Sequence, residues 1–289
     1  MAEKAIKFYK TGIVLVNKPA GISSNAVVNI VKRVLGAKKC GHLGTLDLEG
    51  EGLLPVTVNG ATKLFDFFLN KDKTYETNFV FGFETDTLDT SGQVTKESPC
   101  DISKEEVEAV IKTMIGKYAQ MPPQYSAKKV NGQTAYKAAR AGVQVELKPK
   151  EIEIYDFKLL NQLDKNLFRF EISCSSGTYI RSVCRDLAEK MSTYGSMQCI
   201  LRTRCGGFKL SDAFSLDEIK SGEFKLMSCE NVFDYPAITL TQNQTEKLLN
   251  GQQIKVVTTD GLYKIFSEND FIGIGEVVGG LLKFKLRLV

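Results

Sequence analysis

Alternating apolar and polar residues predict the strands of this chain. From Tyr75 to Phe83 every second residue is aromatic or threonine. This period of two predicts a strand with one largely aromatic face. Further apolar stretches bounded by turn residues predict three more strands, at 11–21, 151–160 and 167–177.

Apolar residues that recur every three or four positions predict helices between these strands. One helix follows a serine cap, Ser23 or Ser24, and stops at Gly36. A second helix begins at a capping box formed by Ser103 and Glu106. The same spacing predicts two further helices, at 61–69 and 180–191.

The order of these elements indicates the fold class. Strands and helices follow one another without a regular strand-helix-strand order, which is typical of an α+β fold with a mixed, largely antiparallel central sheet and flanking helices. The pattern changes near 234–240, and the segments beyond it are short, strand-like and interrupted by glycine. We therefore expect two domains, a larger one at 1–234 and a small β-rich one at 235–289.

Composition narrows the class of protein. Of the 289 residues, 43% are hydrophobic and 25% are charged, as in ordinary globular proteins. No apolar run approaches the ~18 residues of a membrane-spanning helix, and the N-terminal segment lacks a signal-peptide core, so we expect a cytoplasmic protein without membrane contact. The seven cysteines form no C-x-x-C pair and there is one histidine, so we expect reduced thiols and no metal site. A net charge of +4 permits a polyanionic partner without requiring one.

The glycine-rich segment 40–55, CGHLGTLDLEGEGLLP, is the first candidate for chemistry. It holds the only histidine, His42, and five residues later Asp47. Glycines let a large ligand come close to the backbone. A single loop aspartate is more often a turn former, however, and a single histidine is more often structural. These two residues do not define a catalytic site by themselves.

Other segments combine basic and aromatic residues, which suits nucleic acid. Tyr75 stands near lysines at a strand start, where it is either a core aromatic or a stacking platform. The segment 121–142 carries tyrosines among basic residues, although such a run is also typical of a solvated helix face. Arg181 and Arg185 lie four apart on one helix face, and an arginine beside a carboxylate could keep it ionised in a dry pocket. The segment 83–92, FETDTLDTSG, lacks the spacing of a calcium loop and predicts a capped turn.

Taken together and in sequence order, five motifs resemble the TruB family of tRNA pseudouridine synthases. They are GHLGTLD, KTY with TDTLDTSG, QMPPQYSAKKVNG, GTYIRS and LRTRCGGF. The resemblance runs from VNKPAG to about Phe214. The tail, with ITLTQNQTEKLLNGQ and FIGIGEVV, resembles the PUA RNA-binding module often attached to that family. The resemblance implies a pseudouridine synthase fold with a PUA-like C-terminal domain, no cofactor, and a monomer.

The resemblance also implies a reaction and roles for individual residues. The family converts the uridine at position 55, in the T-loop of tRNA, to pseudouridine, so tRNA is the implied partner. Asp47 matches the catalytic aspartate, Tyr75 the aromatic that stacks on the target base, and Arg181 the arginine that pairs with the aspartate. Leu201 matches an apolar residue of the base pocket, and His42 the histidine that helps to fill the space left by the everted nucleotide. The family's first motif, which holds Lys18, is mainly structural. Basic residues in or near the motifs are nevertheless expected to contact RNA, and they are Lys18, Lys71, Lys73, Lys128, Lys129, Arg140, Arg202 and Arg204.

The implied chemistry sets requirements for the site. Pseudouridine formation breaks the N1–C1′ bond, turns the uracil and rebuilds the link through C5. It needs a nucleophile or base near C1′ and C6, and neither a metal nor a redox cofactor. We expect Asp47 to be kept ionised by Arg181 and shielded from water. The uridine must be everted, at a cost of a few kcal/mol.

Two departures and two alternative functions accompany this interpretation. Leu48 stands where the family usually has proline, and Glu49 and Glu51 add negative charge to a loop expected to face phosphates. One alternative is an RNA-binding or tRNA-folding module whose chemistry is incidental. The other is a glycosidase that pairs Asp47 with Glu49 or Glu51, which would require one buried, protonated acid.

Overall fold

The computed structural model describes residues 11–65, 71–125, 129–130, 133–134 and 147–289. Its centre is a nine-stranded sheet in which the main path runs in the order β1-β3-β12-β4-β11-β10-β7. All pairings in this sheet are antiparallel except that of β12 with β3, so the expected mixed, largely antiparallel sheet is confirmed. The strands are β1 (Gly12–Lys18), β2 (Cys40–His42), β3 (Glu51–Val58), β4 (Lys73–Phe81), β7 (Gly116–Gln120), β10 (Lys150–Asp164), β11 (Leu167–Cys174), β12 (Gly195–Cys205) and β13 (Phe208–Lys209).

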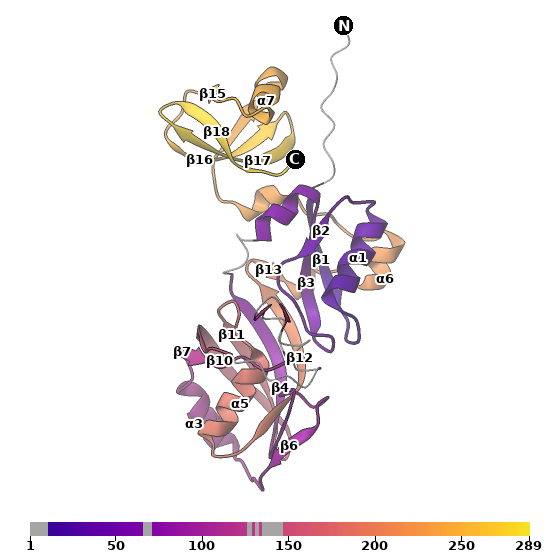
Figure 1. The fold of residues 1–289 in the computed structure, drawn as a ribbon, viewed down its shortest axis with the longest axis vertical. Coiled ribbons are helices and arrows are strands. Elements are labelled where there is room, and N and C mark those ends of the chain that lie inside the picture. The colour runs from indigo at the N-terminus through magenta and orange to yellow at the C-terminus, as the bar shows by residue number, and fades with distance from the viewer. Residues whose placement is uncertain (1–10, 66–70, 126–128, 131–132, 135–146) are drawn as a thin grey trace.

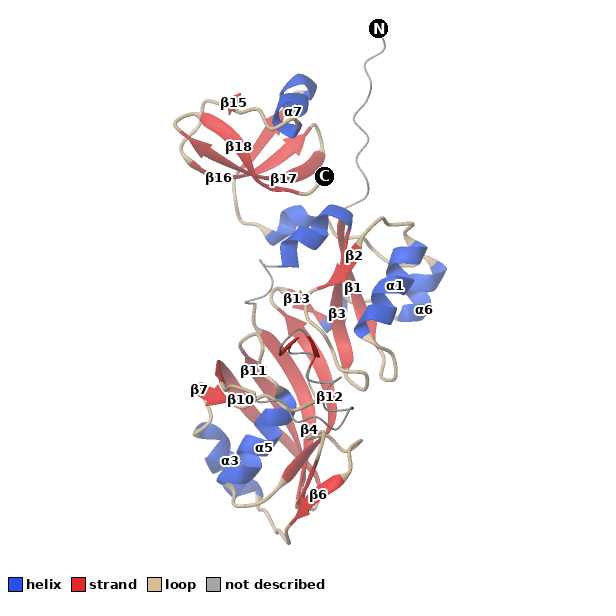
Figure 2. Ribbon diagram, viewed as in Figure 1, coloured by secondary structure: helices blue, strands red, loops and turns tan. Residues whose placement is uncertain are grey.

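Helices cover this sheet in two groups, as Figures 1 and 2 show. Near β1 and β3 lie α1 (Ser24–Val34) and α6 (Leu216–Ser221), which pack against each other. At the other end α3 (Lys104–Lys112) packs on β10, and α5 (Ile180–Lys190) packs on β12. Between these groups, β12 reaches β3 only through Leu201 and Arg202, so the two halves of the sheet meet along a short parallel contact.

The local signals behind these elements are specific. Ser23 caps α1, because its Oγ accepts a hydrogen bond from the Ala26 N–H at 3.1 Å. Gly36 ends the helical segment in the left-handed region, at φ 58°. The predicted strand from Tyr75 is β4, whose aromatic face contributes buried rings to the core. In the predicted helix at 61–69, residues 61–64 belong to a 3-10 helix, η1 (Asn59–Leu64), Phe65 is α-helical, and residues 66–69 lie outside the described residues.

A second, five-stranded sheet forms the C-terminal part of the chain. It curls in the order β14-β16-β17-β18-β15, and the expected division at 234/235 falls just before its first strand. Only β14 and β16 are parallel. Its elements are β14 (Ala237–Leu240), α7 (Gln242–Leu249), β15 (Ile254–Lys255), β16 (Gly261–Ser267), β17 (Asp270–Val278) and β18 (Leu281–Arg287).

The end of the C-terminal sheet is docked on η1. Leu288 is fully buried in a hydrophobic cluster that also contains Leu64 and Ile274, so this cluster joins the two sheets. Lys63 Nζ donates to the Arg287 carbonyl at 2.7 Å. A Cβ atom placed on Gly60 would overlap the Leu288 carbonyl oxygen, so this contact requires glycine.

Substitution of Gly60 by alanine tests this contact. The added methyl group must push the Leu288 backbone away, and we expect the free energy of unfolding to fall by about 1–3 kcal/mol, as for other overpacked sites. The matched control is Gly207→Ala, because a Cβ there meets nothing within 4 Å and we expect a change within about 0.5 kcal/mol. Urea unfolding of both variants gives the measurement. Equal stability of the two variants would contradict the proposed fit at Gly60.

Candidate active site

One cavity of about 340 Å³ brings together residues from distant parts of the sequence. The segment that follows β2 supplies Asp47, β4 supplies Tyr75, and the first turn of α5 supplies Arg181. These segments meet because β4 pairs with β12 at the centre of the sheet and α5 lies against β12. Four of the five residues matched to the family's site therefore lie in one cavity, His42 being the fourth.

Asp47 and Arg181 form a direct ion pair. Arg181 Nη2 donates to Asp47 Oδ2 at 2.8 Å. The Arg181 side chain is only 7% exposed, whereas that of Asp47 is 56% exposed. The expectation that the protein shields Asp47 from water is therefore wrong, because the carboxylate sits on a loop at the mouth of the cavity. The guanidinium is the buried partner, and it orients one oxygen of an accessible carboxylate.

Arg181 is also held by the segment 83–92, which no sequence motif linked to it. Its Nη1 donates to the Thr87 carbonyl at 2.9 Å and lies 3.6 Å from Asp89 Oδ2. Its Nη2 also donates to the Tyr125 carbonyl at 3.0 Å. The predicted capped turn is present, since Asp89 Oδ1 accepts from the Ser91 N–H at 3.2 Å. One oxygen of Asp89 thus fixes the turn while the other faces Arg181.

Two buried cations hold the backbone of the loop that carries Asp47. Lys18 is fully buried, and its Nζ donates to the carbonyls of Pro19, Leu48 and Gly50. Arg202 is also buried, and it donates to the carbonyls of Leu53 at 2.7 Å and Gly44 at 3.1 Å. The expected phosphate contact of Lys18 is therefore wrong, because its three N–H donors are committed to main-chain carbonyls. Arg202 also donates to carbonyls, but its side chain lines the cavity of Asp47, so its expected contact with RNA stays a prediction.

The same loop is also fastened to the start of α1. Ser24 Oγ accepts from the Leu46 N–H at 3.0 Å and donates to the Leu46 carbonyl at 2.8 Å. The Gly21 N–H donates to the Leu48 carbonyl at 3.0 Å. These bonds fix the backbone of the loop although the residue after Asp47 is leucine and not proline. The side chains of Leu48, Glu49 and Glu51 are exposed.

Tyr75 and His42 line the same cavity as Asp47. Tyr75 is 8% exposed, and burial raises the pKa of its hydroxyl, so it remains protonated. Burial lowers the pKa of His42, and the charge of Arg202 lowers it further, so the imidazole is neutral at neutral pH. Within the described part of the chain, His42 Nδ1 is buried without a hydrogen-bond partner. An unpaired polar atom in the wall of a cavity is a natural contact for a polar ligand.

The lowered pKa of His42 predicts a pH dependence of stability. The unfolded chain keeps the ordinary pKa of about 6.5, so it binds more protons than the folded chain just below that pH. The free energy of unfolding should therefore decrease as the pH falls below 6.5, by at most about 1.4 kcal/mol per pH unit from this residue. Urea unfolding at about pH 7.5 and about pH 5.5 measures the slope. His42→Gln should make the decrease smaller, and an unchanged slope would contradict the assignment.

Leu201 does not line this cavity, contrary to expectation. Ile200 and Met197 do. Ile200 pairs with Thr77, which lies on the face of β4 that carries Tyr75, whereas Leu201 pairs with Glu76 on the other face. Successive side chains of a strand point to opposite faces, so a shift of one residue changes which side chain lines the cavity.

The remaining basic residues are distributed more widely than expected. Lys73 is buried in the wall of the cavity and donates to the Lys71 carbonyl at 2.6 Å. Lys71 and Arg204 line a separate cavity of about 700 Å³. Lys128 and Arg140 lie outside the described residues, and the side chain of Lys129 is likewise not described.

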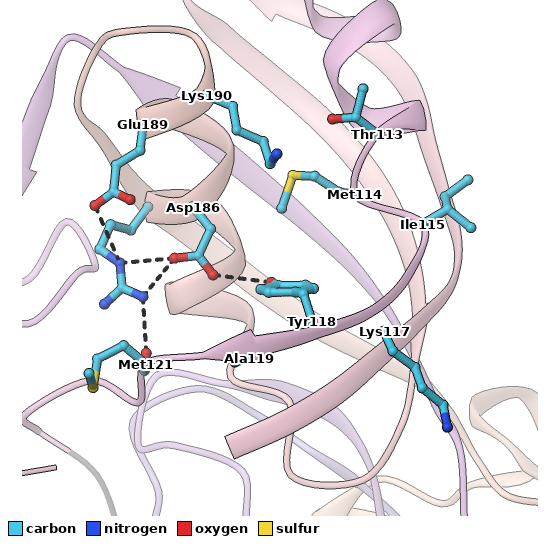
Figure 3. A pocket seen from close by; sticks show the side chains of 11 residues that line it. Thr113, Met114, Ile115, Lys117, Tyr118, Ala119, Met121, Asp186, Glu189 and Lys190 are labelled. Carbon is cyan, nitrogen blue, oxygen red and sulfur yellow. Dashed lines mark hydrogen bonds and ion pairs between the residues drawn. The ribbon is translucent and has the colours of Figure 1, made fainter. Parts of the chain in front are cut away.

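Another cavity, of about 670 Å³, lies between α5 and β7 and shares no lining residue with the first (Figure 3). Arg185 reaches into it rather than toward Asp47. Its Nη2 donates to Asp186 at 2.6 Å and to the Met121 carbonyl at 3.0 Å, and the Tyr118 hydroxyl donates to Asp186 at 3.1 Å. Arg185 therefore ties α5 to the segment after β7, although it shares a helix with Arg181.

The described residues contain no cluster that could bind a metal ion, and none of their helices is long and apolar enough to cross a bilayer.

The fold is shared with solved structures of related architecture. A chain of an H/ACA RNP bound to a substrate RNA containing 2′-deoxyuridine superposes with a TM-score of 0.66 at 18% identity, over 96% of this chain and 85% of that chain. A chain of a Cbf5-Nop10-Gar1 complex gives 0.67 at 19% identity, over 96% and 85%.

Sequence comparison specifies the class. The chain is a pseudouridylate synthase, because the model described as TruB family pseudouridylate synthase (N terminal domain) matches residues 32–180. The model described as Pseudouridine synthase II TruB, C-terminal, matches residues 236–287. The chain belongs to the TruB family and is an isomerase.

Two curated relatives cover nearly the whole chain. The tRNA pseudouridine synthase B of Caldanaerobacter subterraneus is 35% identical over 95% of this chain and 98% of its own length. The protein of the same name from Aquifex aeolicus is 38% identical over 96% of this chain and 99% of its own length. This similarity extends through both sheets, so it includes the C-terminal part as well as the cavity.

Proposed function

We propose that this enzyme converts the uridine at position 55, in the T-loop of tRNA, to pseudouridine. The names of the relatives support tRNA as the substrate. The observation that carries the proposal is the accessible carboxylate of Asp47, oriented by the buried Arg181 in a cavity that also contains Tyr75. The proposed site needs no residue from a second copy, and we propose that the enzyme acts as a monomer.

Each residue of the cavity has its own role in the proposed reaction. The everted uracil stacks on the ring of Tyr75, which contributes ~1–3 kcal/mol toward the cost of eversion. Asp47 acts at C1′ or C6 as nucleophile or base. The N1–C1′ bond breaks, the uracil turns, and a C5–C1′ bond forms. The hydrogen on C5 leaves to solvent and N1 gains a proton, so atoms and electrons balance without a cofactor.

Shielding of the reacting centre comes from the substrate in this proposal. Asp47 faces the opening of the cavity, so an RNA loop that inserts its nucleotide covers the carboxylate at the same time. Removal of water then strengthens the interaction between Asp47 and Arg181. The exposed carboxylate of the protein alone is thus compatible with a dry site during the reaction.

Tritium release tests the proposed reaction. A tRNA transcript labelled with [5-³H]uridine should release tritium from one position, with no added metal and in the presence of a chelator. The matched control is the same transcript with cytidine at position 55, which should release none. No release from either transcript, or equal release from both, would contradict the proposed substrate position.

A further inference from the structure

A second aromatic ring lines the cavity of Asp47 and Tyr75. Phe65, which follows η1, is 44% exposed, whereas Tyr75 in the same cavity is 8% exposed. The two rings therefore lie at different depths. Tyr75 forms part of the buried wall, and Phe65 lies where the cavity opens to solvent.

The 3-10 helix η1, which precedes Phe65, is anchored at both of its ends. The Asn59 N–H donates to the Lys39 carbonyl at 2.7 Å, and the Thr62 hydroxyl donates to the Asn59 carbonyl at 2.9 Å. Leu64, the residue before Phe65, is fully buried in the cluster that joins η1 to the C-terminal sheet. The ring of Phe65 thus follows directly on an anchored segment, which reduces the conformational entropy lost when a ligand binds it.

The charges around Phe65 indicate the ligand class. Lys73, Arg181 and Arg202 line the same cavity together with one acidic residue, Asp47, so the charged side chains of the lining carry a net positive charge. A single exposed phenylalanine is ordinary on a protein surface. An exposed ring beside basic residues, at the mouth of a cavity that takes a nucleotide, has the composition of a site that stacks nucleic-acid bases.

We propose that Phe65 stacks on a base of the RNA that neighbours the everted uridine. This inference rests on the proposed function, because it assumes that an RNA nucleotide occupies the cavity at Tyr75. Eversion of one nucleotide removes a stacking partner from its neighbours in the loop. Phe65 replaces that partner at the entrance, while Tyr75 receives the everted base inside. The two rings then hold successive parts of one RNA segment, and Phe65 contributes to affinity rather than to bond breaking.

Three substitutions at Phe65 separate stacking from simple apolar contact. Phe65→Ala should weaken binding of a T-arm stem-loop about 5- to 100-fold, the range that base–aromatic stacking provides. Phe65→Tyr should bind within about twofold of the wild type because it keeps a ring. Phe65→Leu should resemble the alanine variant more than the tyrosine variant. Single-turnover rates at saturating RNA should stay within about threefold for all three variants.

The control is Leu163→Ala, an aliphatic residue with the same 44% exposure that lines none of the cavities described above. It should bind RNA like the wild type. As a direct readout, 2-aminopurine placed next to the target uridine should be quenched on binding to the wild type and to Phe65→Tyr, and less quenched with Phe65→Ala. Wild-type affinity of Phe65→Ala or of Phe65→Leu overturns the proposal, as does a loss of affinity that follows a lowered melting temperature. If the wild type releases no tritium from tRNA, the proposed function fails instead.

Discussion

Replacement of Asp47 by asparagine should abolish tritium release while leaving the fold intact. Asparagine keeps the size of the side chain and an oxygen that accepts from Arg181, but it lacks the charge that a nucleophile or base requires. We expect the single-turnover rate to fall by at least about 1000-fold. The loop itself should not move, because the donors of Lys18, Ser24 and Arg202 hold its backbone and none of them bonds the Asp47 side chain. Melting temperature and tRNA affinity should therefore remain close to those of the wild type.

The matched control for this variant is Glu49→Gln. It makes the same chemical change two residues away, on an exposed side chain that does not line the cavity. We expect its rate to stay within about threefold of the wild type. Normal turnover by Asp47→Asn would remove Asp47 from the reaction. Equal losses in both variants would show that net charge of the loop, rather than the carboxylate at 47, controls the rate.

The two alternative functions, a glycosidase and a tRNA-folding module, lead to different expectations for the same loop. A glycosidase that paired Asp47 with Glu49 or Glu51 would need a buried acid, and both glutamates are exposed outside the cavity. A role in tRNA folding remains a prediction of its own. Such a role would appear as rescue of a deletion strain by Asp47→Asn, since that variant should still bind and open the tRNA.

Local structure could be predicted from the sequence because its causes are local. The cap at Ser23, the stop at Gly36 and the alternation that begins at Tyr75 each depend on neighbouring residues only. The partners of β4 could not be predicted in this way. Alternation defines the two faces of a strand but not the strands beside it, and β11 and β12 come much later in the chain.

Roles that depend on tertiary contacts could not be predicted from the sequence either. Lysine and arginine are mostly exposed, so Lys18 and Arg202 suggested RNA contacts, whereas both are buried against carbonyls. Asp89 looked fully explained by its turn, and its second oxygen turned out to face Arg181. The exposure of Asp47 has the same origin, because whether a loop closes over a carboxylate is set by the packing of distant segments.

Substitution of Arg181 by lysine should give the second large loss. The guanidinium reaches Asp47 Oδ2 at 2.8 Å, the Thr87 carbonyl at 2.9 Å and the Tyr125 carbonyl at 3.0 Å. An ammonium group is compact and cannot make these contacts together, so the carboxylate of Asp47 loses its fixed orientation. We expect the single-turnover rate to fall at least about 100-fold, the usual cost of a misplaced reacting group. Stability should fall by about 1–3 kcal/mol, because buried carbonyls lose donors.

Arg185→Lys separates the catalytic effect of this substitution from its structural effect. Arg185 lies one turn further along α5, is also largely buried, and donates to Asp186 and to the Met121 carbonyl in a cavity that shares no lining residue with that of Asp47. A comparable loss of stability is therefore expected, with a single-turnover rate within about threefold of the wild type. Thermal melting and single-turnover tritium release on both variants give the comparison. If the two variants lost the same fraction of their rate, Arg181 would act by holding α5 in place, and the orientation of Asp47 would have to come from elsewhere.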